Sequence, residues 1–192
     1  MTELGAIVAI LLAAGQSRRF GTDDKLMAEL RGVPLAVHAA RVLIDFASGR
    51  LIAICADCDG PLARRFAALG FEAVPNLLPD HGISNSVRLG INAARSGREQ
   101  AALLMLADMP FVTSVHLRSM LDRFDPGTAP VVGSSMRGVA MPPALFDRSR
   151  FDELEQLHGD MGGRALLASA VLVAAPAGEL TDIDRPGQLP PD

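Results

Sequence analysis

Two kinds of apolar pattern alternate along the chain, and this alternation limits what it can fold into. Short runs that are apolar on both faces, typical of buried strands, occupy residues 6–12, 51–55, 71–74, 101–106, 129–132 and 171–174. Between them, apolar residues spaced three and four apart predict helices at residues 35–46, 62–69, 83–94 and 115–124. Right-handed crossovers then give a doubly wound, mostly parallel sheet, so we expect a three-layer, Rossmann-like α/β fold.

The length and composition fit one domain over residues 1–192. A chain of 192 residues can bury a core without disulfide or metal support, and 49% of its residues are apolar. The alternation breaks at residues 133–143, which include SSMRGVAMPP, and the acidic RFDELEQLHGD and the helical GGRALLASA follow. We therefore expect an insertion or lid around residues 133–170, over the carboxyl edge of the sheet, where ligands bind in such folds.

Charge and cysteine content narrow the class of protein further. The net charge of −4 argues against a general nucleic-acid binder, which needs a basic surface. The apolar run at residues 6–14 is too short to span a bilayer and lacks a preceding basic segment, so we expect a cytoplasmic chain without a membrane partner. Cys55 and Cys58 form a CxxC, but no second Cys/His pair follows. We therefore favour Cys55 as a buried apolar residue over a redox or zinc site.

The loop after the first strand, within LLAAGQSRRFG, is suited to binding an anion. Glycines allow the backbone to approach a phosphate closely, while backbone N–H groups and basic side chains attract it; the residues concerned are Gly15, Ser17, Arg18, Arg19, Gly21 and Lys25. The spacing of the glycines does not match a P-loop, and Ser17 replaces the second glycine of the dinucleotide fingerprint. A solvated strand-to-helix turn is the alternative interpretation.

Asp108 follows a strongly apolar run, AALLMLAD, which places it at the carboxyl edge of a central strand. A carboxylate facing a polyphosphate would repel it, whereas Mg²⁺ between them binds both groups of oxygens. This residue is therefore a candidate metal ligand. The alternative is that Asp108 caps the helix predicted to follow.

Several segments in the same order resemble the MobA-like nucleotidyltransferase family. LAAGQSRRFG with Lys25 is similar to its first signature, and the other matching segments are NLLPDHGISNSVRLGI, LLMLADMPFV and LTDIDRPGQL. FDELEQLHGDMGGRALL resembles a segment ending in Gly-Asp-x-Gly-x-Arg in the molybdenum cofactor cytidylyltransferase branch. Two departures stand out: Arg185 replaces a threonine of the closing motif, and MPPALF lacks a Gly-His-Pro of the family.

The resemblance implies a role for each matching residue. The catalytic cations would be Arg19 and Lys25, and the metal ligands Asp108 and Asp184, with Asp182 near the latter. The nucleotide-binding residues implied are Leu12, Ala13, Ala14, Gly15, Ser17, Asn76, Ser86 and Gly90. Those on the acceptor side are Asp160, Gly162 and Arg164. Each set has a structural alternative: a surface turn at TDID, a helix start capped by Ser84 or Ser86, and a loop between helices.

The function expected from this resemblance is Mg²⁺-dependent transfer of a nucleoside monophosphate to a phosphorylated molybdopterin, with release of pyrophosphate. The branch implies CTP as donor, and the product would serve a molybdenum hydroxylase apoenzyme. GMP transfer and a sugar phosphate acceptor are alternatives within the class. Outside it stand an NAD(P)-dependent oxidoreductase and a non-catalytic nucleotide-binding chaperone of a molybdenum enzyme.

Overall fold

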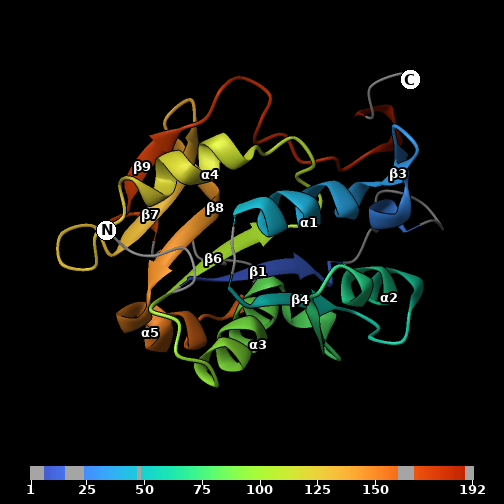
Figure 1. The fold of residues 1–192 in the computed structure, drawn as a ribbon, viewed down its shortest axis with the longest axis horizontal. Helices are drawn as coiled ribbons and strands as arrows, with labels where there is room; N and C mark the ends of the chain where they lie inside the picture. Colours follow the sequence, from blue (N-terminus) through green and yellow to red (C-terminus); the bar gives the residue numbers. More distant parts are fainter. Residues whose placement is uncertain (1–6, 16–23, 47–48, 160–166, 189–192) are drawn as a thin grey trace.

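The computed structural model describes residues 7–15, 24–46, 49–159 and 167–188. Its main sheet has seven strands in the order β5-β4-β1-β6-β8-β7-β9 (Figure 1). Their bounds are β1 Ile7–Ala13, β4 Leu51–Cys55, β5 Glu72–Pro75, β6 Ala101–Leu106, β7 Val131–Met136, β8 Val139–Asp147 and β9 Val171–Ala174. A two-stranded hairpin pairs β2 (Glu29–Leu30) with β3 (Val33–Pro34). The helices are α1 Leu35–Phe46, α2 Pro61–Ala68, α3 Ile83–Arg95, α4 Ser114–Leu121 and α5 Phe151–Glu155.

The sheet is mostly parallel, as predicted, but it contains one reversed strand that the sequence did not indicate. β8 runs antiparallel to both of its neighbours, β6 and β7. Residues 133–143 were expected to interrupt the alternation and begin an insertion or lid. Instead, this segment contributes most of β7 and the first half of β8 to the sheet. Pro142 and Pro143 fall where the β7–β8 register shifts, between Gly133 and Ser134, so the proline nitrogens are not needed in the ladder.

Helices cover both faces of the sheet and form three layers (Figure 1). Ile7, Ala9 and Leu11 of β1 pack into a core with residues of α1, α2 and α4. The alternate residues Val8 and Ile10 pack into a second core with α3 and α5. Every residue of β1 is buried, which explains why its sequence is apolar on both faces.

The order of the strands creates a crevice at the carboxyl end of β1. The chain leaves β1 for β4 on one side and returns after α3 to β6 on the other. Just past the end of β6, the Ala107 N–H donates to the carbonyl of Leu12 in β1 at 3.1 Å, so the carboxyl ends of these two strands stay together. Open α/β sheets bind ligands at this kind of switch point.

The cysteines behave as the sequence suggested. Cys55 is buried at the end of β4, Cys58 is half-buried, and neither forms a disulfide. Burial raises the pKa of the Cys55 thiol to about 12, with a further contribution from Cys58, so the thiol stays protonated at neutral pH. This environment favours a packing role over a redox role.

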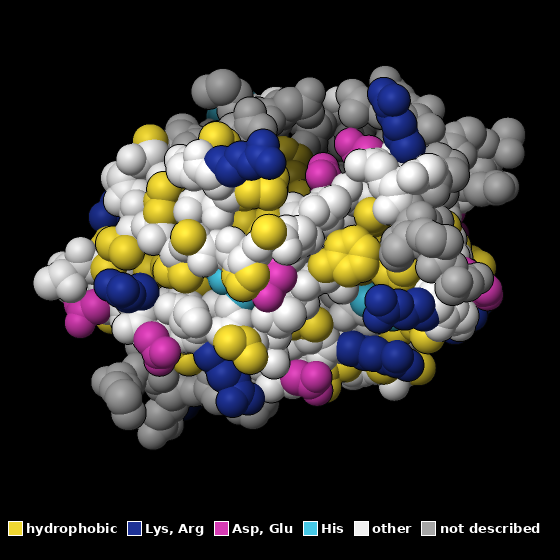
Figure 2. All heavy atoms as spheres, turned by 90° about the horizontal axis from the view of Figure 1, so that it is seen from above, with side chains coloured by type: hydrophobic (Ala, Val, Ile, Leu, Met, Phe, Trp, Pro, Cys, Tyr) yellow, Lys and Arg dark blue, Asp and Glu magenta, His cyan; other side chains and the backbone are white. Residues whose placement is uncertain are grey.

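On the face seen from above in Figure 2, described basic and acidic side chains are interspersed rather than gathered by sign. No helix among the described residues is both long enough and apolar enough to cross a membrane.

Candidate active site

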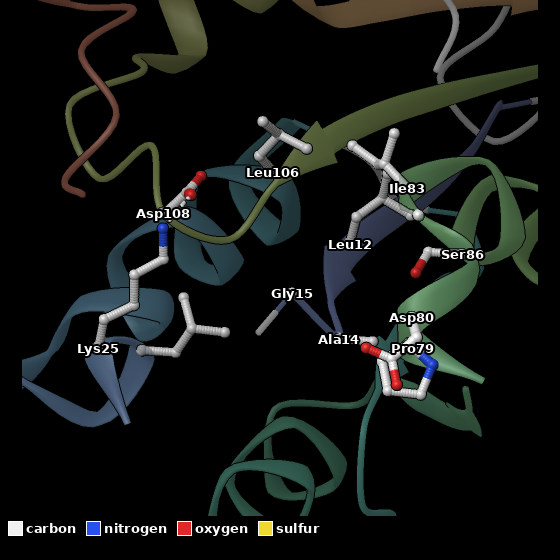
Figure 3. Close-up of a pocket in the computed structure, with 12 residues that line it drawn as sticks. Leu12, Ala14, Gly15, Lys25, Pro79, Asp80, Ile83, Ser86, Leu106 and Asp108 are labelled. Atoms are coloured by element: carbon white, nitrogen blue, oxygen red, sulfur yellow. Dashed lines mark hydrogen bonds and ion pairs between the residues drawn. The ribbon is translucent and has the colours of Figure 1, made fainter. Parts of the chain in front are cut away.

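A cavity of about 350 Å³ lies at the crevice beyond β1 and β6 (Figure 3). It is lined by Leu12, Ala14, Gly15, Lys25, Leu26, Pro79, Asp80, Gly82, Ile83, Ser86, Leu106 and Asp108. Figure 3 shows Lys25 and Asp108 at one end, Asp80 and Ser86 at the other, and Gly15 between them. The predicted residues Leu12, Ala14, Gly15, Lys25, Ser86 and Asp108 are thus brought to one cavity.

Lys25 joins two carboxylates from distant parts of the chain. Its Nζ donates to Asp108 Oδ2 at 2.7 Å and to Asp184 Oδ1 at 2.9 Å. The side chains of Lys25 and Asp108 are only 12% and 17% exposed, whereas that of Asp184 is 37% exposed. The ammonium group is therefore held between an inner and an outer carboxylate.

The pKa values of this pair reflect burial opposed by mutual attraction. Burial lowers the pKa of Lys25, but the contacts with Asp108 and Asp184 outweigh it and raise the pKa above its ordinary value. Burial raises the pKa of Asp108, Lys25 partly offsets the rise, and the nearby charge of Asp182 adds to it. The raised pKa keeps Lys25 charged at neutral pH, and its contact with Asp108 favours the ionised carboxylate against the effect of burial.

Local structure fixes each member of the cluster. Asp24 accepts the Leu26 N–H at 3.0 Å and so starts the 3-10 turn that carries Lys25. Asp108 lies two residues beyond β6. The helix that follows is capped by Thr113, whose side chain accepts the His116 N–H, so the cap role considered for Asp108 is filled by another residue.

The closing segment is attached by the residue next to Asp184. Ile183 is fully buried against Leu30 and Leu35, and its N–H donates to the Asp108 carbonyl at 3.0 Å. The side-chain oxygen of Gln188 accepts the N–H groups of Asp184 and Arg185, each at 2.7 Å. Gln188 thus closes the turn in which Arg185 replaces the usual threonine.

The carboxylates fit a divalent cation that is shared with a ligand. Asp108 Oδ1 is buried and accepts no hydrogen bond from the described residues. No group of three or more His, Cys, Asp or Glu side chains among those residues is arranged to hold a metal. Two carboxylates are too few for a cage, but Mg²⁺ is commonly held by one or two carboxylates together with substrate phosphates.

The other end of the cavity is formed by the start of α3. Gly82 precedes the helix with φ of 80° and no side chain caps the helix there, in contrast to the alternative that Ser84 or Ser86 does so. Gly82 and Ile83 both line the cavity, so the uncapped N–H groups lie beside it. The N-terminus of a helix favours an anion or another acceptor.

A model for the MobA-like NTP transferase domain matches residues 9–175. The chain belongs to the MobA-like NTP transferase family. The "Purine catabolism protein PucB" of Bacillus subtilis is 28% identical over 94% of this chain and 92% of that protein. The "Probable molybdenum cofactor guanylyltransferase" of Haloferax mediterranei is 30% identical over 73% of this chain and 65% of that protein. The solved structure of Rv0371c from Mycobacterium tuberculosis matches 93% of each chain with a TM-score of 0.75 and 26% identity.

The family predicted from LAAGQSRRFG is therefore confirmed, together with the nucleotidyltransferase class. The cavity is also lined by residues that the sequence analysis did not select, among them Pro79, Asp80, Gly82 and Ile83. They belong to the NLLPDHGISNS segment, and all four lie at or within four residues before the start of α3 at Ile83.

Part of the predicted MobA-like site lies outside the described residues. Ser17 and Arg19 fall within residues 16–23, and Asp160, Gly162 and Arg164 fall within residues 160–166. Their assigned roles remain predictions.

Three predicted nucleotide-binding residues do not line the cavity. Ala13 is buried in the core on the α1 side of the sheet. Asn76 is 1% exposed and its amide contacts Ser86 rather than the cavity. Gly90 faces β1, and a Cβ atom there would lie 2.6 Å from Ile10 Cγ2.

Gly90→Ala tests whether this glycine serves packing or binding. We expect the free energy of unfolding to fall by about 1 to 3 kcal/mol, because the added methyl overpacks the α3–β1 contact. Chemical denaturation measures this, and the affinity of the folded variant for nucleotide should stay within about twofold of the wild type. In an Ile10→Ala background the added methyl should cost less, since the Cγ2 atom is gone. A large loss of affinity at unchanged stability would instead make Gly90 a direct contact.

Proposed function

We propose that the protein transfers a nucleoside monophosphate, CMP from CTP, to the terminal phosphate of a molybdopterin-type acceptor. The observation that carries this proposal is that Lys25 and Asp108 line one end of a cavity whose other end is the start of α3, and that Lys25 also binds Asp184. Such a site can hold a polyphosphate at one end and a nucleoside at the other.

The proposed reaction is an in-line displacement at phosphorus. An oxygen of the acceptor phosphate forms a bond to the α-phosphorus of the nucleoside triphosphate, the bond from that phosphorus to the bridging oxygen breaks, and pyrophosphate leaves. The acceptor phosphate is ionised at neutral pH, so no general base is needed. Phosphoryl-type transfer of this kind depends on positioning and on neutralising charge.

Each residue has a task in this scheme. The backbone from Ala14 to Ser17 would bind the triphosphate, and Lys25, with Arg19, would neutralise charge that develops on the leaving group. Asp108 and Asp184 would hold Mg²⁺, which supplies Lewis-acid neutralisation of phosphate oxygens when bound. The acceptor would be recognised by Asp160, Gly162 and Arg164.

The resemblance of FDELEQLHGDMGGRALL to the cytidylyltransferase branch supports CTP as the donor. The relative named as a guanylyltransferase makes GTP the competing donor. The product nucleotide would be passed to a molybdenum hydroxylase apoenzyme.

A panel of the four nucleoside triphosphates, each with purified molybdopterin and Mg²⁺, tests the proposal. We expect pyrophosphate release with CTP at least about tenfold faster than with the other three, and none after chelation of the metal. Faster pyrophosphate release with GTP would contradict the proposed choice of CTP as donor but would agree with the proposed transfer reaction. Binding of NADH without binding of any triphosphate, or tight triphosphate binding without turnover, would overturn the reaction in favour of an oxidoreductase or a silent chaperone.

A further inference from the structure

A chain of buried amides lies behind the cavity and ends at the hydroxyl of Ser86. Asn76 Nδ2 donates to Ser86 Oγ at 2.9 Å, and Asn85 Nδ2 donates to Asn76 Oδ1 at 2.6 Å. The three side chains are buried, with residues 1%, 6% and 5% exposed for Asn76, Asn85 and Ser86. Of the three, only Ser86 lines the cavity, where Figure 3 shows it projecting from α3.

The backbone fixes which way round the Asn76 amide lies. The Leu78 N–H donates to Asn76 Oδ1 at 3.0 Å, and a backbone N–H can only donate. The oxygen of Asn76 must therefore face Leu78 and Asn85, and its nitrogen must face Ser86. Asn76 is held in place by its own N–H as well, which donates to the Cys55 carbonyl at 2.7 Å.

This orientation determines the polarity of the Ser86 hydroxyl. A hydroxyl has one hydrogen to donate and lone pairs that accept. Because Asn76 Nδ2 donates to Ser86, the hydroxyl oxygen is an acceptor on that side and its own hydrogen is directed elsewhere. Within the described part of the chain, no group accepts that hydrogen. The Ser86 hydroxyl can therefore donate its hydrogen to a ligand in the cavity.

We infer that Ser86 donates a hydrogen bond to an acceptor atom of the bound nucleotide, and that Asn76, supported by Asn85, is a positioning residue that sets this polarity. The inference rests on the proposed function, since it takes the cavity to hold a nucleoside triphosphate. It assigns Asn76 a role one step removed from the ligand. It also explains why two asparagines are buried beside a site where apolar residues would fill the same space more cheaply.

Two substitutions separate the presence of the hydroxyl from its direction. Ser86→Ala removes the donor and is expected to weaken CTP binding in the presence of Mg²⁺ by about tenfold, the effect of one hydrogen bond. Asn76→Asp keeps the hydroxyl and the shape of the site, but a carboxylate oxygen can only accept. The Ser86 hydroxyl then donates to the introduced carboxylate and turns its lone pairs toward the nucleotide, so we expect CTP binding to weaken by about tenfold or more. Asn85→Ala leaves the hydrogen bond from the Leu78 N–H to Asn76 Oδ1 in place, so it should cost less.

The double variant distinguishes a role of Asn76 that acts through Ser86 from a general structural role of Asn76. If Asn76 acts through Ser86, adding Asn76→Asp to Ser86→Ala should weaken CTP binding by no more than about twofold further. Independent effects would multiply to about a hundredfold. The matched control is Ser84→Ala on the same helix, whose buried hydroxyl donates to the His81 carbonyl at 3.4 Å and does not line the cavity. Its CTP affinity should stay within about twofold.

Titration calorimetry with each of the four triphosphates makes the outcomes distinct. Multiplicative losses, or a Ser86→Ala variant that binds CTP as tightly as the wild type, would overturn the inference while leaving the proposed function standing. If the wild-type protein binds triphosphate, the losses in the double variant are non-multiplicative and no pyrophosphate is released, the inference is supported and the proposed reaction is contradicted. A wild-type protein that binds none of the four would overturn both.

Discussion

Asp108→Asn is expected to lower kcat/KM for pyrophosphate release by about a thousandfold, the scale on which a bound cation stabilises charge in a transition state. The amide keeps the size of the side chain and can still accept from Lys25, but it brings no charge to a metal. Because Lys25 still donates to the amide oxygen and to Asp184, the thermal midpoint of unfolding should stay within a few degrees. Pyrophosphate release and thermal denaturation measure the two effects.

The matched control for this variant is Asp45→Asn, which removes the same charge from an exposed position on α1. It should leave both kcat/KM and the unfolding midpoint unchanged. If Asp108→Asn retained a tenth of wild-type activity, Asp108 would not be the metal ligand. Asp182→Asn and Asp184→Asn compare the two carboxylates of the closing segment, and the contact of Asp184 with Lys25 predicts the larger loss for Asp184→Asn.

Lys25→Met is expected to lower kcat/KM by about a hundredfold, because the ammonium group that would neutralise charge developing on the leaving pyrophosphate is then lost. The pH dependence should change as well. Lys25 normally lowers the pKa of Asp108 against the effect of burial, so its loss raises that pKa further. Since Asp108 must be ionised to act, the acid limb of the pH–rate profile should move to higher pH. Lys25→Arg keeps the positive charge and should hold the limb near its wild-type position.

An unshifted acid limb in Lys25→Met would contradict this assignment. A second measurement is available because Lys25 is the only lysine among 192 residues. An amine-specific reagent can modify only this side chain and the N-terminus, and Lys25→Arg reports the N-terminal contribution. CTP with Mg²⁺ should slow the modification of Lys25.

The strands and helices that form within one stretch of sequence could be predicted closely. β4, β6, β9 and α1 have the bounds that their apolar patterns indicated. β8 was missed because MPPALF contains two prolines, which argue against a strand unless a bulge removes the need for their N–H groups. That bulge depends on pairing with β7 and so has no local signal.

In the candidate site, too, some residues could be predicted from the sequence and others could not. Lys25, Asp108 and Asp184 could be selected by residue type and resemblance, although 159 positions separate the first from the last. The role of Asn85 could not be selected, because its amide acts only through contact with Asn76 across a buried turn. Gly90 appears in a motif for a reason that sequence alone does not distinguish from binding: it allows α3 to approach β1.

The attachment of Ile183 implies that the two carboxylates are not equally secure. Asp108 lies two residues beyond a central strand, whereas Asp184 is held by its contact with Lys25, by the buried neighbour Ile183 and by the turn that Gln188 closes. Ile183→Ala would remove the buried anchor and should loosen the outer carboxylate more than the inner one. The position of Asp184 can therefore be perturbed while Asp108 and the rest of the domain stay in place.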